Sequence, residues 1–309
     1  MAGITTYLSA RAGYKREAGR QHSMFKKLMP RFIREARAAE DGSVTERDLH
    51  RVTAHATRVP LTLGATYALL RGTPLTDEER ICQTLLGGLT PICHDYFDRP
   101  ELCEERLLKS MGAPLEIDPE SAHEWIYIRF MRILPHLVPD IDTFYPAFRE
   151  VYRTQLATRQ QGQKNLSYTD LKGLFYDQGS AVAHLARTLV RTPIDEAELA
   201  AVQQWGWVLQ LVDDTMNLHK DQEAGRQTVA TTADNITAYT ALCHEEFREL
   251  AKRVRALGRS KAQTERILGR MLLVLARGLS MLQQLQQQPK AVAKPSDLAM
   301  MRAYLDFKW

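Results

Sequence analysis

The sequence predicts an all-α protein, and three observations lead to this fold class. Apolar residues recur at helical spacing along most of the 309 residues. No run of alternating apolar residues is long enough to require a β-sheet. Helix start and stop signals are frequent, whereas neither a repeat of fixed period nor a long linker interrupts the chain. We therefore expect a single domain of about a dozen helices.

Four helices are expected in the first hundred residues, over about residues 17–40, 45–55, 60–70 and 76–98. The first is basic and amphipathic, and the sequence Asp-Gly-Ser at residues 41–43 ends it. Pro60 is expected to open the third. The fourth begins with a capping box in which Thr76 is the N-cap and Glu79 follows three residues later. Pro91 predicts a kink in this fourth helix.

The rest of the chain continues the helical pattern. Further helices are expected over about residues 101–111, 120–136, 141–160, 168–190, 195–222, 233–256, 260–286 and 296–308. Residues 287–295 are polar and flanked by proline, which predicts a surface loop before the short closing helix.

Composition narrows the class of protein. Apolar residues make up 44% and charged residues 25%, which is the balance of a globular protein with a substantial core. No apolar run is long enough to span a bilayer, and residues 1–20 lack the apolar region of a signal peptide, so a cytoplasmic location is expected. The four cysteines form no zinc-binding pattern, and the net charge of +4 is too small to indicate nucleic-acid binding. The basic residues between Arg11 and Arg37 leave open a peripheral contact with an anionic membrane surface.

The most informative segment is an acidic stretch at the end of the helix predicted over 195–222. Asp213, Asn217 and Asp221 are spaced i, i+4 and i+8, so they lie within an arc of about 80° on one helix face. Negative charge is unfavourable at the C-terminal end of a helix unless a cation compensates it. Oxygen ligands suit a hard cation such as Mg²⁺. The spacing therefore predicts a metal site, with a solvated acidic face as the alternative.

A second acidic pair lies at the end of the helix predicted over 76–98. Asp95 and Asp98 are spaced i and i+3 and share a face. Such a pair alone is usually a surface feature. Two oxygen clusters, each at the C-terminal end of a helix, could instead face each other across a bundle and hold metal ions between them.

These two segments resemble the metal motifs of the class I isoprenoid synthases. Asp213-Asp214-x-x-Asn217-x-x-x-Asp221 is similar to the second metal motif of class I terpene synthases, and Asp95-Tyr96-Phe97-Asp98 occupies the place of the first. About 118 residues separate the two motifs, which suits this fold. The short first motif is most similar to the squalene-synthase-like terpene synthases of bacteria, called class IB. The resemblance covers about residues 60–285.

The resemblance implies an isoprenoid-synthase-type bundle of helices around a central cavity. It implies N-terminal helices over 1–57, a catalytic bundle over 58–286, and a loop with a closing helix over 287–309. It also implies three Mg²⁺ ions, two of them held by Asp95 and Asp98 and the third by Asp213, Asn217 and Asp221. The substrate would be a prenyl diphosphate, namely farnesyl, geranylgeranyl or a longer chain. A homodimer is left open.

The resemblance also implies which side chains bind the substrate or take part in the reaction. The expected catalytic residues are Arg226, Lys172 and Tyr176. The expected substrate-binding residues are Arg226, Lys172, Lys220, Tyr96, Phe97, Phe175, Trp207, Arg302 and Tyr304. Cations stabilise a departing diphosphate, and aromatic rings can face a carbocation. Arg302 and Tyr304 resemble an Arg-Tyr pair that closes some terpene cyclase sites.

Two further segments resemble parts of such enzymes. The stretch from Lys172-Gly173 to Gly179-Ser180 resembles the place where these enzymes often break a helix beside the cavity. Residues 225–234, rich in Thr and Ala, are expected to form a lid that orders on binding and excludes water.

Three functions are open from the sequence. A terpene synthase that gives a cyclic or linear product is favoured, because the chain lacks the longer first motif and the Gly-Lys-x-x-Arg-Pro segment of chain-elongating enzymes. The first alternative is a chain-elongating or head-to-head prenyltransferase, although residues 95–99 do not match the Asp-x-x-x-Asp pattern of head-to-head enzymes. The second is a non-catalytic relative that binds a prenyl lipid.

Overall fold

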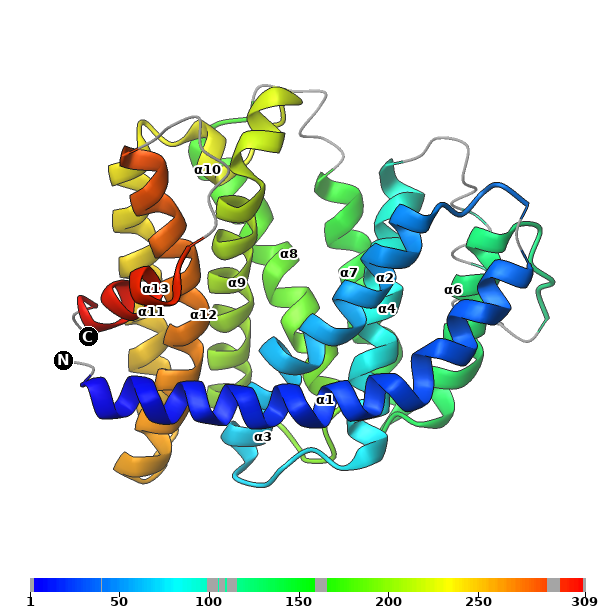
Figure 1. Ribbon diagram of the computed structural model, residues 1–309, viewed down its shortest axis with the longest axis horizontal. Helices are drawn as coiled ribbons and strands as arrows, with labels where there is room; N and C mark the ends of the chain where they lie inside the picture. Colours follow the sequence, from blue (N-terminus) through cyan, green and yellow to red (C-terminus); the bar gives the residue numbers. More distant parts are fainter. Residues whose placement is uncertain are drawn as a thin grey trace. The chain divides into compact units, whose positions relative to one another are not determined.

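The computed structural model describes residues 3–39, 41–98, 105, 109, 116–158, 166–287 and 295–307. Every regular element within these ranges is a helix, so the all-α prediction is confirmed (Figure 1). The helix expected over 101–111 and most of the loop expected over 287–295 lie outside the described residues. No helix among the described parts of the chain has the length and apolar character that crossing a bilayer requires.

The chain divides into two compact units, and each is described by itself. Unit 1 contains residues 1–15, 147–185 and 193–309, and unit 2 contains residues 16–146 and 186–192. Three helices have residues in both units: α1 (Ile4–Ala38), α7 (Ile141–Thr158) and α8 (Tyr168–Thr188). The single domain expected from the sequence stays a prediction.

Unit 2 is organised around α2 (Glu46–Val59) and α4 (Asp77–Asp98), which pack along each other (Figure 1). The helices approach closely because α4 has glycines on the contact face: a Cβ at Gly87 would clash with the carbonyl of His55, and one at Gly88 would lie 2.9 Å from the Phe130 ring. Phe130 belongs to α6 (Ala122–Ile133), which also packs on α4 and continues into a 3-10 turn, η2 (Leu134–His136). α4 runs through Pro91 without ending there.

Local capping determines where several of these helices begin and end. The capping box predicted at the start of α4 is confirmed, because the Thr76 N–H donates to Glu79 Oε2 at 2.8 Å and the Glu79 N–H donates to Thr76 Oγ1 at 3.2 Å. α1 ends at Ala38, as the breaker sequence predicted. Gly42 follows with φ of 85°, a conformation that glycine adopts without a steric penalty.

Pro60 does not open a new helix, so this expectation is wrong. α2 continues through a π-helical turn, η1 (Pro60–Gly64), directly into α3 (Ala65–Arg71). A proline has no N–H to donate to the carbonyl four residues before it, which here belongs to Ala56. The buried Gln21 side chain satisfies that carbonyl instead, at 3.1 Å, and also donates to Thr84 Oγ1 at 2.9 Å.

The first helix is longer than expected, since α1 begins at Ile4 rather than near residue 17. Its first turns are held by residues near the other end of the sequence, within unit 1. The Tyr7 ring meets Tyr304 edge-on at 5.1 Å, Arg11 forms an ion pair with Asp297, and the Arg270 guanidinium lies 4.5 Å from the Tyr14 ring centroid. These contacts lie too far apart in sequence for a local pattern to reveal them.

The rest of unit 1 is a group of long helices. α9 (Glu196–Glu223), α11 (Ile236–Ala256) and α12 (Lys261–Gln287) pack on one another, and α13 (Asp297–Leu305) packs on α12 (Figure 1). The short α10 (Val229–Thr232) packs on α9. The bounds of α9 differ by one residue at each end from the helix predicted over 195–222.

The helix expected over 168–190 is confirmed as α8, which runs without interruption from Lys172 to Ser180, so the helix break suggested by the resemblance is absent. Gly179 serves close packing instead. A Cβ there would lie 2.6 Å from the carbonyl oxygen of Gly206 on α9. The two glycines therefore let the backbones of α8 and α9 approach each other.

We predict that Gly179→Ala lowers the free energy of unfolding by about 2 kcal/mol, because the added methyl group must push two helix backbones apart. Gly173→Ala is the matched control on the same helix, where an added Cβ meets no described atom within 4 Å. We expect it to leave stability unchanged or raise it by up to about 1 kcal/mol, since alanine favours a helix over glycine. Urea denaturation of both variants checks this, and equal stabilities would contradict the close α8–α9 contact.

We also predict that unit 2 loses stability in mild acid through His55. Burial, together with the charges of Arg58, His94 and Arg51, lowers the pKa of His55 to about 4. A histidine in the unfolded chain has a pKa near 6.5, so below that pH the unfolded state takes up the proton first and the folded state is disfavoured. The linked loss amounts to about 2 kcal/mol between pH 7.5 and pH 5. Urea denaturation at both pH values should show a smaller loss for His55→Gln, and equal losses would refute this assignment.

Candidate metal and substrate site

The second acidic motif lies on the last turns of α9, in unit 1. Asp195 begins this helix, because its carboxylate accepts a hydrogen bond from the Glu198 N–H at 2.7 Å. Fully buried Trp205 and Trp207 fix its middle in the core. The acidic face then runs from an exposed Asp213 to an Asp221 that is only 7% exposed.

The triad shares a face, as its spacing predicted. Asn217 Nδ2 donates to Asp213 Oδ2 at 2.9 Å and to the Asp213 carbonyl at 3.1 Å. The amide of Asn217 is therefore positioned beside the Asp213 carboxylate. Three oxygen-bearing side chains follow one another along two turns of helix, and hard cations prefer such ligands.

The charged form of Asp221 is disfavoured on this face, mainly by burial, which raises its pKa. The charges of Arg226 and Lys220 lower this pKa, and the negative charge of Asp213, a smaller effect, raises it. A bound divalent cation would favour the charged form of both carboxylates, so the donor set on α9 fits Mg²⁺.

Asp214 lies on another side of α9 and is directed into the interior. The residue is 3% exposed, and its carboxyl group accepts a hydrogen bond from Gln210 Nε2 at 2.9 Å. Among the described residues, its Oδ2 atom has no hydrogen-bond partner. Burial holds the pKa of Asp214 well above its usual range, and the charges of Asp213 and Asp221 add to this effect. The sequence pattern includes Asp214 in the motif but predicts no role for its side chain.

A turn after the triad presents Arg226. Gly225 adopts φ of 63°, and the Arg226 N–H donates to the Asp221 carbonyl at 2.8 Å. The Arg226 side chain is exposed, as is that of Lys220. Thr231 Oγ1 donates to the Arg226 carbonyl at 2.9 Å, which ties the turn to α10. The segment expected to act as a lid is thus a turn and a short capped helix, and its movement stays a prediction.

The other residues expected to act on the substrate from α8 lie beside α9 and α11. Lys172 forms an ion pair with Glu246 of α11 at 2.7 Å, and Glu246 also accepts from Gln204 Nε2 at 2.9 Å. Lys172 is therefore engaged within the protein. Tyr176 is half-buried with its ring 6.1 Å from that of Trp207.

Most of the expected aromatic residues pack in the core. Phe175 and Trp207 are buried in unit 1, and Tyr96 is buried in unit 2, where its ring meets those of His123 and Tyr127 edge-on. The side chain of Phe97 lies outside the described residues. The role of these rings in binding a substrate stays a prediction.

Arg302 and Tyr304 on α13 are not brought together as a pair. Arg302 is exposed, whereas Tyr304 is fully buried against Tyr7. The Tyr304 hydroxyl packs against Gly269, since a Cβ added to that glycine would lie 2.9 Å from the hydroxyl oxygen. The geometry thus points to a packing role for Tyr304 and gives no support to an Arg-Tyr closing pair.

The first acidic motif lies at the end of α4, in unit 2. Asp95 is 4% exposed and both of its carboxylate oxygens are engaged: Arg51 Nη1 lies 2.7 Å from Oδ1, and His123 Nε2 lies 3.1 Å from Oδ2. Arg51 Nη2 also donates to the Pro91 carbonyl at 3.3 Å. The side chain of Asp98 lies outside the described residues.

The two motifs therefore differ in their fit to a metal ion. The α9 face offers oxygen ligands whose mutual repulsion a cation would relieve. Asp95, in contrast, already has Arg51 as a cation, which would have to withdraw before the carboxylate could bind another. No three His, Cys, Asp or Glu side chains converge as a metal-binding group within the described ranges. The three-ion arrangement across both motifs stays a prediction.

Comparisons with known proteins leave the chain without an assigned family, since no family model matches it and no curated protein matches it.

We predict that Arg51→Gln lowers the free energy of unfolding by about 3 kcal/mol, because it leaves the buried Asp95 carboxylate without its cation. Adding Asp95→Asn should restore part of that loss, since it removes one of the two buried carboxylates, Asp48 and Asp95, with which Arg51 forms ion pairs. Arg37→Gln is the control in the same unit: it breaks the exposed Arg37–Glu46 pair and should not change stability measurably. Urea denaturation checks all three, and an Arg51→Gln protein as stable as the parent would show that this ion pair is unimportant.

Proposed function

We propose that this chain is a Mg²⁺-dependent class I terpene synthase that ionises a prenyl diphosphate and releases a cyclic or linear terpene. The observation that supports it best is the end of α9, where Asp213, Asn217 and Asp221 share one face. A turn at Gly225 then presents an exposed cation, Arg226, immediately after them. Oxygen ligands followed by a guanidinium suit a metal-bound diphosphate.

The packing of α8 on α9 supports a substrate site at this position. Gly206 of α9 contacts α8, and Asp213 lies seven residues further on, so the two residues share a face. α8 runs antiparallel to α9 from the Gly179–Gly206 contact, so Gly173 lies at about the level of Asp213. Gly173 is exposed but lies about 120° away from Gly179 around α8, so it does not face α9. Lys172, seven residues before Gly179, shares the face of Gly179, so α8 presents a cation at the level of Asp213.

The residues of this face have distinct tasks in the proposed reaction. Asp213, Asn217 and Asp221 would hold Mg²⁺, which supplies charge neutralisation to the diphosphate as the allylic C–O bond breaks. Arg226 and Lys220 would donate hydrogen bonds to the departing diphosphate. Tyr176, half-buried against Trp207, would present an aromatic ring near the hydrocarbon chain.

Two ion pairs must open for the full family arrangement to form. Lys172 would have to leave Glu246 to reach a diphosphate, and Asp95 would have to exchange Arg51 for magnesium. Each exchange is feasible only where the ligand returns at least as much electrostatic stabilisation as the internal partner gave.

The same ion pairs favour the second candidate, a non-catalytic protein that binds a prenyl lipid. A chain whose first acidic motif is permanently neutralised would keep the helical scaffold without ionising a diphosphate. The face on α9 argues against this candidate, because a lipid-binding protein has no use for clustered carboxylates. Release of diphosphate that required two prenyl substrates would instead indicate a chain-elongating or head-to-head prenyltransferase.

We predict that the protein releases diphosphate from farnesyl or geranylgeranyl diphosphate only when Mg²⁺ is present. Asp213→Ala or Asn217→Ala should lower this rate by at least about a hundredfold, because each removes an oxygen ligand from the metal. A phosphate-release assay with inorganic pyrophosphatase measures the rate, and gas chromatography identifies the products.

Glu223→Gln is the matched control, since Glu223 is an exposed carboxylate at the same helix end but lies about 120° around the axis from Asn217, the middle residue of the triad. It should keep the parent rate. Circular dichroism verifies that all variants are folded. Full activity in either triad variant would end the metal assignment, and no release at any chain length would favour the lipid-binding protein.

A further inference from the structure

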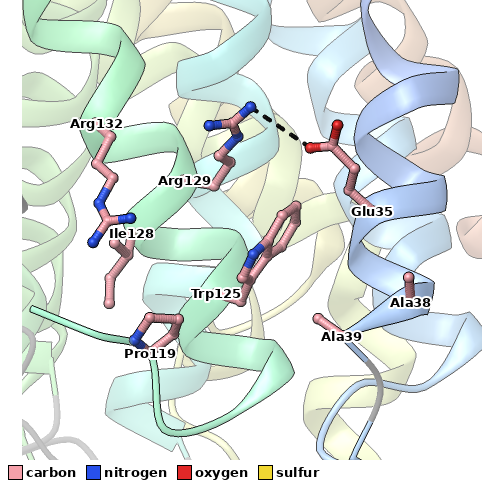
Figure 2. A pocket seen from close by; sticks show the side chains of 8 residues that line it. All are labelled: Glu35, Ala38, Ala39, Pro119, Trp125, Ile128, Arg129 and Arg132. Carbon is pink, nitrogen blue, oxygen red and sulfur yellow. Dashed lines mark ion pairs between the residues drawn. The ribbon is translucent and has the colours of Figure 1, made fainter.

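A second concave site lies in unit 2, between the end of α1 and the outer face of α6. It has a volume of about 460 Å³, which lies within the range of small-molecule sites in proteins. Figure 2 shows side chains from both elements around it. None of its residues belongs to the acidic motifs or to the set expected to contact a prenyl diphosphate.

One part of the pocket is apolar and rigid. Trp125 and the buried Ile128 come from α6, Pro119 precedes that helix, Ala38 ends α1 and Ala39 follows it (Figure 2). The Trp125 ring lies 5.5 Å from that of Phe32, which is itself stacked on Phe130 at 4.3 Å. The indole is therefore supported from behind, and a flat apolar ligand can pack on it without ordering a flexible side chain.

The other part of the pocket is basic. Arg129 and Arg132 are spaced i and i+3 on α6, so their guanidinium groups lie on the same side of the helix. Arg132 Nη2 donates to the Ile117 carbonyl at 2.8 Å, which fixes this side chain. The one acidic residue of the lining, Glu35, leaves the ionised side chains of the pocket with a net charge of +1, two arginines against one glutamate.

The Arg129–Glu35 ion pair is weak enough for a ligand to compete with it. Glu35 accepts a hydrogen bond from Arg31 Nε at 2.7 Å, whereas Arg129 Nη2 lies 3.6 Å from its other oxygen, longer than a charge-assisted hydrogen bond (Figure 2). The Arg129 side chain is 40% exposed. The planar guanidinium of Arg129 can bind a carboxylate by donating two parallel hydrogen bonds to it.

We propose that this pocket binds a small aromatic carboxylate, with the ring against Trp125 and the carboxylate on Arg129. Arg132 adds a second positive charge on the same side of the helix. The inference does not depend on the proposed function, because the pocket shares no residue with the α9 face.

The test uses naphthoate and its uncharged analogue naphthamide, which have the same shape and differ in charge. Isothermal titration calorimetry with the full chain should show naphthoate binding at least about tenfold tighter than naphthamide, since a hydrogen-bonded ion pair at Arg129 is lost with the amide. Affinity for naphthoate should fall as salt is raised.

Variants of the two pocket charges make the test specific. Arg129→Gln should weaken naphthoate binding about tenfold and leave naphthamide unchanged, whereas Glu35→Gln should tighten naphthoate binding by removing a competitor for Arg129. Arg153→Gln is the control, because Arg153 forms a similar exposed pair with Glu150 in unit 1. Equal binding of the two ligands, unchanged binding by Arg129→Gln, or no binding of naphthoate at millimolar concentration would overturn the proposal.

Discussion

The cost of removing carboxylates from water constrains both acidic motifs, and each motif meets that cost in a different way. In unit 2, Asp95 is almost fully buried and is stabilised by Arg51 and His123, one on each carboxylate oxygen. In unit 1, Asp213 remains exposed while Asp221 is nearly buried, and burial with repulsion raises the pKa of Asp221. The charge of Asp95 is compensated within the protein, whereas a bound cation would stabilise the carboxylates of the α9 face further. The α9 face is for this reason the stronger basis for a metal site.

Local patterns were sufficient to predict much of the fold. The Thr76–Glu79 capping box and the bounds of α9 depend on residues within a few positions of each helix end, so the sequence displays them directly. The first turns of α1 could not be predicted in this way, because they are held by Tyr304, almost three hundred residues away. The expectation that Pro60 opens a new helix was wrong for the same reason. The hydrogen bond that Pro60 cannot donate is replaced by one from the Gln21 side chain, which belongs to another helix.

The candidate site shows the same division between local and distant information. Helical periodicity placed Asp213 and Asn217 on one face, and their side chains are 2.9 Å apart. The partners of Asp95 and Lys172 come from other helices, so spacing along the chain gave no sign that these charges were already paired. Spacing along the chain also could not show that Tyr304 is buried and Arg302 exposed. This difference follows from the packing of α1 on α12 and α13.

The face of α9 that carries the triad changes its role along the helix. Near the middle, Gly206 has no side chain, so α8 approaches the backbone directly at Gly179. One turn later Gln210 still contacts α8, since a Cβ on Gly179 would lie 3.1 Å from the Gln210 Cβ. Two turns after Gly206 the same face presents the exposed Asp213. A face that begins as tight helix packing thus ends in polar side chains, of which Asp213 is open to solvent. Packing alone does not require carboxylates there, because exposed polar residues of either sign would serve. The carboxylates are concentrated at a helix C-terminus, where the helix dipole disfavours negative charge, and Lys220, Arg226 and the proposed Mg²⁺ are the cations that would offset it.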